Sequence, residues 1–187
     1  MKTLSTFLVL MIAIPAFSQV TLNLNKVDDF TGALTKTTNY SSDVFVYKDN
    51  DPKDIRSGAT INFFIQREDS IYWFGLHFRF KFCCLSQYDG KVLIKLTDGT
   101  IMECLQVTNT DCSDYPSAMY IPLKREGEEF DITAFKRANV NWDKLSNTPI
   151  EQIRVYGSEY YQDFIPNPKF TEFPAQNILI EHLKALK

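Results

Sequence analysis

The feature that most constrains the fold is a strict alternation of side chains from Tyr72 to Phe82. Large apolar residues occupy every second position of this segment, and mainly polar or small residues lie between them. Successive side chains of a β-strand point to opposite faces, so this period predicts a strand with one face in a core. The core-facing set is Tyr72, Phe74, Leu76, Phe78, Phe80 and Phe82, and the opposite set is Trp73, Gly75, His77, Arg79 and Lys81.

Other segments add strands to this pattern. Ile61, Phe63 and Ile65 share one face of a strand predicted over Ala59–Arg67, and the Arg67–Ser70 run has the composition of a polar turn. The chain is therefore expected to form short strands separated by turns. Further strands are predicted at Val20–Leu24, Leu34–Tyr40, Asp43–Lys48, Met119–Leu123, Ile150–Tyr156 and Gln162–Ile165.

Asp-Gly dipeptides at Asp89-Gly90 and Asp98-Gly99 each lie between strand-like runs. This dipeptide tolerates the positive φ values of two-residue hairpin turns, so a three-stranded meander is expected. A two-residue turn pairs Thr97 with Thr100, which leaves Glu103 as an exception on an otherwise apolar inward face. That inward set is Val92, Ile94, Leu96, Ile101 and Leu105.

The C-terminal segment has a different period. Its apolar residues recur at helical spacing after Pro174, a residue that suits the first turn of a helix. An amphipathic helix that docks on the sheet is therefore expected. The apolar positions are Ala175, Leu179, Leu183 and Leu186, and a separate single helical turn is predicted at Asn141–Leu145, with Asn141 as its cap.

These elements predict an all-β fold with one domain over residues 19–187. The favoured architecture is an antiparallel two-sheet β-sandwich with a C-terminal amphipathic helix, and a partly closed barrel is the alternative. Both architectures bury the phenylalanine-rich face, so the period alone does not separate them.

Residues 1–18 have the features of a cleavable signal peptide. Met1-Lys2 provides a positive start, an apolar run of 11 residues follows from Phe7 to Phe17, and Ala16-Phe17-Ser18 places small residues at a cleavage site. The apolar run is shorter than the about 20 residues that a membrane-spanning helix needs. The sequence therefore predicts a secreted or periplasmic protein that does not span a membrane.

The charge of the chain bears on its partners. Lys and Arg number 20 and Asp and Glu number 23, for a formal net charge of −3. A nucleic-acid-binding protein would show a basic excess, so no nucleic-acid partner is expected.

Four cysteines in an exported chain predict disulfides, because the compartment is oxidising. Cys104 and Cys112 flank a predicted turn, which would bring their Cα atoms close enough for a disulfide, so this pairing is favoured. It leaves Cys83 and Cys84 free or bonded to each other. In the alternative pairing, one of the adjacent cysteines bonds to Cys112. Adjacent cysteines lack the spacer of typical zinc motifs, so no metal site is predicted.

Motifs for catalysis are weak. His77 and His182 lie in no metal-binding or triad motif, and Ser158 lacks the second glycine of a nucleophile elbow. The acidic run from Asp49 to Asp54 departs from the spacing of a calcium-binding loop, which favours a solvated turn. No catalytic residue and no cofactor are therefore predicted.

Aromatic residues are the one feature that favours binding, since flat rings stack on sugars. Trp73 alternates outward on the central strand, Trp142 lies near the short helix, and Tyr160 and Tyr161 are adjacent. Filling of a core is the competing explanation for such residues. The candidate ligand-binding residues are thus Trp73, Trp142, Tyr160 and Tyr161.

Three short motifs occur in the mature chain, at Val27–Gly32, Leu96–Gly99 and Ile150–Tyr156. Together they resemble a group of small secreted β-rich proteins of Gram-negative bacteria, a family of unknown function. The resemblance implies export and a β-rich fold, and it supplies no catalytic residues.

The leading functional hypothesis is a non-enzymatic binding module with a glycan or an envelope protein as its ligand. One alternative is a small secreted hydrolase that acts on glycan or peptide, and another is a structural component of the cell envelope. Aromatic rings in a common groove would favour binding, and two converging carboxylates would favour the hydrolase.

Overall fold

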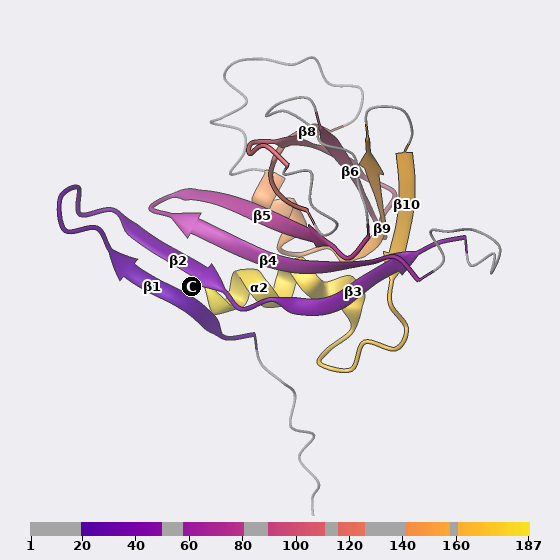
Figure 1. Ribbon diagram of the computed structural model, residues 1–187, viewed down its shortest axis with the longest axis horizontal. Coiled ribbons are helices and arrows are strands. Elements are labelled where there is room, and N and C mark those ends of the chain that lie inside the picture. Colours follow the sequence, from indigo (N-terminus) through magenta and orange to yellow (C-terminus); the bar gives the residue numbers. More distant parts are fainter. Residues whose placement is uncertain (1–19, 50–57, 81–89, 111–115, 126–140, 158–160) are drawn as a thin grey trace, which may run out of the picture.

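The computed structural model describes residues 20–49, 58–80, 90–110, 116–125, 141–157 and 161–187. These residues form a ten-stranded antiparallel sheet whose strand order is β1-β2-β4-β3-β10-β9-β6-β7-β8-β5 (Figure 1). The strands are β1 Leu22–Val27, β2 Leu34–Thr38, β3 Ser41–Tyr47, β4 Thr60–Glu68, β5 Ile71–Phe78, β6 Lys91–Leu96, β7 Ile101–Gln106, β8 Ser117–Arg125, β9 Ile150–Tyr156 and β10 Tyr161–Pro166.

Strand β4 closes the sheet into an eight-stranded barrel. Along one edge β4 pairs with β5 over its whole length, from Ile61 opposite Phe78 to Glu68 opposite Ile71. Its other edge is shared, because β3 pairs with its first half and β2 with its second half. The β1–β2 hairpin therefore projects from the barrel, as Figure 1 shows.

This arrangement confirms the predicted all-β fold with a C-terminal helix, and it shows that the predicted two-sheet sandwich is wrong. The barrel alternative is nearer to the structure, in which the ring of strands is fully closed. Strand period reports only which side chains face inward. It carries no information on whether β4 and β5 complete a ring, because that depends on pairing between distant strands.

The alternation that begins at Tyr72 holds in the structure. Phe74, Leu76 and Phe78 are fully buried, and Tyr72 and Phe80 are partly buried against the same core. Strand β5 ends at Phe78, and Phe82 lies outside the described residues. The prediction of an extended segment with alternate rings in the core is therefore confirmed over β5.

Aromatic stacking fills part of the barrel interior. The ring of Phe74 stacks between Phe63 of β4 and Tyr120 of β8, with ring centroids 5.9 and 5.5 Å apart. Such offset contacts add to the free energy of burying the rings. The three neighbouring strands β4, β5 and β8 are thus joined by side chains as well as by their backbones.

The register of the β6–β7 hairpin differs from the prediction. The Leu96 amide donates to the Thr100 carbonyl oxygen at 2.9 Å, and Gly99 has a φ of +85°. These features define a three-residue turn with a bulge, one residue longer than the turn expected for Asp98-Gly99. A shift of one residue moves every side chain of β7 to the other face.

The inward set of β7 is therefore Met102, Cys104 and Gln106, and the predicted inward positions of Ile101 and Leu105 are wrong. The shift also explains Glu103, which now shares the outer face. Val92, Ile94 and Leu96 of β6 are fully buried, as predicted.

The predicted C-terminal helix is confirmed. A short 3-10 helix, Ala175–Asn177, follows Pro174 and leads into α2, Ile178–Ala185. Helix α2 packs against β4. The predicted helical turn at residues 141–145 is also present. The α2 segment and this turn contribute Ile178, Leu179, Leu183, Leu186, Trp142 and Leu145 to the main core cluster.

Cys104 is a free thiol, fully buried inside the barrel. Burial raises the pKa of this thiol well above its usual value. The disulfide expected between Cys104 and Cys112 is therefore not formed in this structure. Cys83, Cys84 and Cys112 lie outside the described residues, and so do the signal-peptide segment 1–18, Ser158, and Asp51 and Asp54 of the acidic turn.

Candidate functional site

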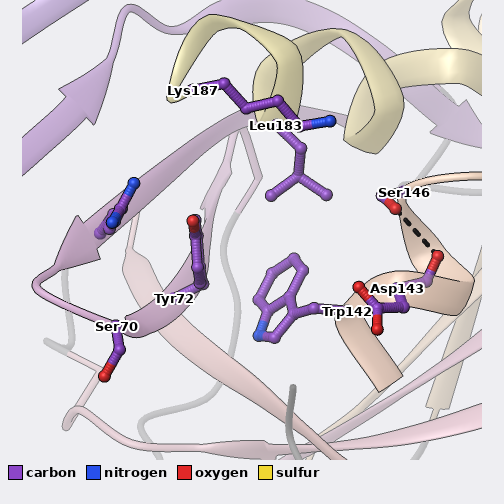
Figure 2. Close-up of a pocket in the computed structure, with 8 residues that line it drawn as sticks. Ser70, Tyr72, Trp142, Asp143, Ser146, Leu183 and Lys187 are labelled. Carbon is purple, nitrogen blue, oxygen red and sulfur yellow. Dashed lines mark hydrogen bonds between the residues drawn. The ribbon is translucent and has the colours of Figure 1, made fainter. Parts of the chain in front are cut away.

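A pocket of about 340 Å³ lies between the β4–β5 turn, the helical turn at 141–145 and the end of α2. These elements are far apart in the sequence and meet beside the barrel core, as Figure 2 shows. The pocket volume falls in the range typical of small-molecule sites. The lining residues are Arg67, Ser70, Tyr72, Trp142, Asp143, Ser146, Leu183 and Lys187.

Two aromatic rings and a leucine form the apolar part of the pocket. The ring centroids of Tyr72 and Trp142 are 5.8 Å apart, and their planes are inclined by 49°. Trp142 is only 5% exposed and contacts the Phe74 ring behind it, with centroids 6.3 Å apart. Leu183 of α2 lies above Trp142 in Figure 2. The indole is therefore held rigidly, while Tyr72 keeps a partly exposed ring.

The positive charges of the pocket come from Arg67 and Lys187. The Arg67 guanidinium lies over the Tyr72 ring, 5.3 Å from its centroid, and donates to the backbone oxygens of Asp69 and Leu186. Neither cation forms an ion pair with a carboxylate of the described residues. Backbone carbonyls thus orient Arg67 without neutralising its charge.

The negative charge comes from Asp143, on the helical turn. Its backbone oxygen accepts hydrogen bonds from Ser146 Oγ at 2.9 Å and Asn147 Nδ2 at 2.7 Å. Its carboxylate forms no ion pair with another described residue. Figure 2 shows Asp143 on one side of Trp142 and Tyr72 on the other. The aromatic rings therefore lie between the acidic wall and the wall that carries Arg67.

An ion pair anchors the helical turn to the barrel. Lys144 Nζ contacts the carboxylate of Asp98 in the β6–β7 turn, and the Thr97 amide donates to the Pro149 oxygen at 3.0 Å. The hydrogen bond from Lys144, with help from the Thr100 amide, lowers the pKa of Asp98 to about 2. Asp143, the residue before Lys144 in the turn, is thereby held at the pocket.

The aromatic candidates from the sequence do not converge on one site. Trp142 lines the pocket, but Trp73 lies on the outer side of β5 and packs near Ile121 and Leu123. Tyr161 is 51% exposed on β10, under the Arg154 guanidinium at 4.0 Å from its ring centroid. Tyr160 lies outside the described residues. Trp73 and Trp142 therefore share no groove.

The pocket residues that sequence analysis missed are Arg67, Tyr72, Asp143 and Lys187. The sequence pattern places Arg67 where a predicted strand meets a polar turn, and Tyr72 among the core-facing residues, and neither position indicates a ligand. Three of the four carry a net charge and form no ion pair within the described part of the chain, a property that appears only when their surroundings are known.

His182 of α2 is fully buried in a polar contact with two strands. Its Nδ1 lies 2.7 Å from Thr38 Oγ1 and its Nε2 lies 3.0 Å from Ser41 Oγ. Burial lowers the pKa of His182 to about 3. Ser41 is also fully buried, so this serine–histidine contact holds α2 against the strands rather than facing a substrate.

His77 lies on the outer surface of β5, where its Nδ1 is 2.7 Å from Ser117 Oγ. Within the described ranges, no three His, Cys, Asp or Glu side chains gather closely enough to hold a metal ion. The described helices also include none with the length and apolarity to cross a bilayer.

Comparison of the chain with protein-family models, curated proteins and solved structures finds no match. The geometry of the pocket is therefore the basis on which a function is proposed.

Proposed function

We propose that the protein is a non-enzymatic binding module whose pocket beside Trp142 takes a small organic ligand. The observation that carries this proposal is the meeting of Tyr72, Trp142 and Leu183 with charged side chains that form no ion pair with another described residue. An apolar wall with a few oriented polar groups is the usual composition of a ligand site. The barrel behind Trp142 provides the rigid support that such a site needs.

The hydrolase alternative requires two carboxylates on either side of a scissile bond. Asp143 is the only carboxylate side chain among the described residues that line this pocket. The composition of the pocket thus favours binding over hydrolysis. We also propose that residues 1–18 act as an export signal, which would deliver the module to the periplasm or the exterior.

The test uses Trp142 as a fluorescent reporter. The chain has two tryptophans, so the Trp73→Phe variant leaves Trp142 as the only indole. A panel of oligosaccharides and short peptides is titrated against this variant. We expect at least one compound class to shift the Trp142 emission, because a ligand that enters the pocket changes the polarity around the ring.

Two ring variants locate the binding. Tyr72→Ala removes the exposed wall of the pocket and is expected to weaken binding at least tenfold. Tyr161→Ala removes an exposed ring outside the pocket and is the matched control, for which affinity should not change. A panel in which no compound binds or shifts the emission would refute the proposed function.

A further inference from the structure

Building on the proposed function, we infer that the ligand is a zwitterion, an amino acid or short peptide with an apolar side chain. In this arrangement the ligand carboxylate lies at Arg67, and its ammonium group lies at Asp143. The apolar side chain lies between them, against Tyr72 and Trp142. The juxtaposition that carries the inference is a cationic wall, formed by Arg67 at the Tyr72 ring, and an acidic wall, formed by Asp143, with the Trp142 ring between them.

The cationic wall fits a carboxylate. A guanidinium presents five N–H donors in a planar fork that matches the two oxygens of a carboxylate. Arg67 directs Nε to the Asp69 oxygen and Nη1 to the Leu186 oxygen, which fixes the plane of the fork and leaves further donors available. The orientation of Arg67 is therefore set before a ligand arrives, which reduces the entropy lost on binding.

The acidic wall fits an ammonium group. The helical turn that carries Asp143 is held by the Asp98–Lys144 ion pair on one side and by the buried Trp142 on the other. The Asp143 carboxylate has no ion pair in the described structure and is exposed at the pocket. Since the neighbouring lysine is already paired with Asp98, a ligand cation is the natural partner for Asp143.

The space between the walls fits an apolar side chain of modest size. Its volume of about 340 Å³ suits a ligand of amino-acid to dipeptide size. Tyr72, Trp142 and Leu183 provide the apolar surface, and the hydroxyls of Ser70 and Ser146 lie at the pocket margin.

Ligands with other charges fit less well. A neutral sugar would cover the pocket and leave Arg67, Lys187 and Asp143 desolvated without partners, which costs free energy. An anionic sugar would satisfy the cations only and would place its charge in the same pocket as the Asp143 carboxylate. A zwitterion satisfies both walls at once.

The experiment compares four forms of one dipeptide, Ala-Phe, by calorimetry and by Trp142 fluorescence in the Trp73→Phe protein. The forms are the free dipeptide, its N-acetyl derivative, its C-terminal amide and the doubly blocked compound. We expect the free dipeptide to bind most tightly. Each single block should weaken binding at least tenfold, because it removes one of the two charge contacts.

Charge variants assign each end of the ligand. In Arg67→Gln the free dipeptide and its amide should bind with similar affinity, because the carboxylate contact is lost. In Asp143→Asn the free and N-acetylated forms should bind similarly. Arg79→Gln and Asp29→Asn are matched controls on exposed residues away from the pocket, and both should keep the full preference for the free dipeptide.

The outcomes separate this inference from the proposed function. Equal affinity for all four forms, or binding of oligosaccharides alone, overturns the zwitterionic ligand and leaves the binding module standing. If no peptide and no oligosaccharide binds, both proposals fall. Unfolding curves of each variant verify that lost binding does not result from lost folding.

Discussion

The β1–β2 and β4–β5 hairpins are built from the same local elements and have opposite environments. Both are antiparallel, and both use an aspartate at the turn. Asp28 Oδ1 accepts from the amides of Phe30 and Thr31, and Asp69 adopts a φ of +50°. Yet every residue of β1 is exposed, whereas β4 and β5 bury six aromatic or aliphatic side chains completely. Those side chains are Ile61, Phe63, Ile65, Phe74, Leu76 and Phe78.

The difference lies in the neighbours of each hairpin. Strands β4 and β5 have partners on both edges and a filled barrel on one face. Strand β1 has a partner on one edge only and carries Leu22, Leu24 and Val27 at 37 to 53% exposure. Apolar composition is thus shared by the two hairpins, and burial is not. Variants of the two hairpins and of their junction test this difference.

Phe74→Ala should destabilise the protein by about 3–5 kcal/mol, because it leaves a cavity between Phe63 and Tyr120. Phe30→Ala at the tip of the β1–β2 hairpin is the control. Phe30 is 99% exposed, so its loss should change stability by less than about 0.5 kcal/mol. Denaturant unfolding measures both. Similar losses for the two variants would contradict the contrast between the hairpins.

His182 lies where the projecting hairpin joins the barrel, since it contacts Thr38 of β2 and Ser41 of β3. Its pKa is about 3 when folded, below the ordinary value of 6.5, so only the unfolded chain binds a proton between these pH values. The free energy of unfolding should therefore fall by about 1.4 kcal/mol per pH unit as pH drops from 6.5 towards 3. Above pH 6.5 His182 should cause no change of stability with pH.

Unfolding curves across this pH range measure the effect. The His182→Gln variant supplies the control, because it has no imidazole to titrate. Its stability should lack the slope between pH 6.5 and about 4, whatever its absolute value. An unchanged slope in this variant would assign the acid sensitivity to other groups.

Gly75→Ala tests close packing on the outer face of the β4–β5 hairpin. A Cβ at this position would lie 1.9 Å from a carbon of the Phe64 ring, so the ring must move. We expect a loss of about 1–3 kcal/mol. In the Phe64→Ala background most of this loss should disappear, because the ring that clashes with the new Cβ is absent. Thermal unfolding of the single and double variants measures the difference.

Gly32→Ala provides the matching change in the projecting hairpin. Gly32 has open space around its Cβ position and a φ of +73°, so the strain comes from the backbone alone. The expected loss is about 1 kcal/mol and is confined to the hairpin. The Phe64→Ala background should leave the loss at Gly32 unchanged. If it reduced the loss of stability from Gly32→Ala as much as that from Gly75→Ala, the two losses would not have separate causes.

Asp28→Ala should have the smallest effect. It removes the acceptor for the Phe30 and Thr31 amides, at 3.0 and 2.7 Å, from an exposed turn. Hydrogen exchange of these two amides should become faster, while exchange in β4 and β5 stays unchanged and global stability shifts by less than about 0.5 kcal/mol. Faster exchange in the barrel strands would show that the hairpin supports the barrel.

Much of the secondary structure was predictable because it follows from the local spacing of apolar residues. The alternation through Phe74 and Phe78 gave the inward face of β5, and the helical spacing of Leu179 and Leu183 located α2. The β6–β7 turn was predicted one residue too short. The Asp98-Gly99 dipeptide is compatible with turns of two or three residues, and the hydrogen bond between Leu96 and Thr100 selects the longer one.

The candidate site was predictable only in part. Trp142 was identified as a binding candidate from its residue type, and it lines the pocket. Arg67, Asp143 and Lys187 were not identified, because charged residues are common and nothing local distinguishes them. They matter because they form no ion pair with another described residue and because aromatic rings lie between Arg67 and Asp143, and both are properties of the assembled chain.

By itself the sequence determined which side chains of β5 and β6 face inward, since that depends on the two-residue period of an extended backbone, but in β7 the length of the preceding turn set the inward face. Tertiary structure alone decided that β4 joins β5 to close a barrel, that β1 remains outside it, and that three distant segments meet at Trp142. These choices depend on hydrogen bonds and packing between residues far apart in the chain, for which a local pattern contains no signal.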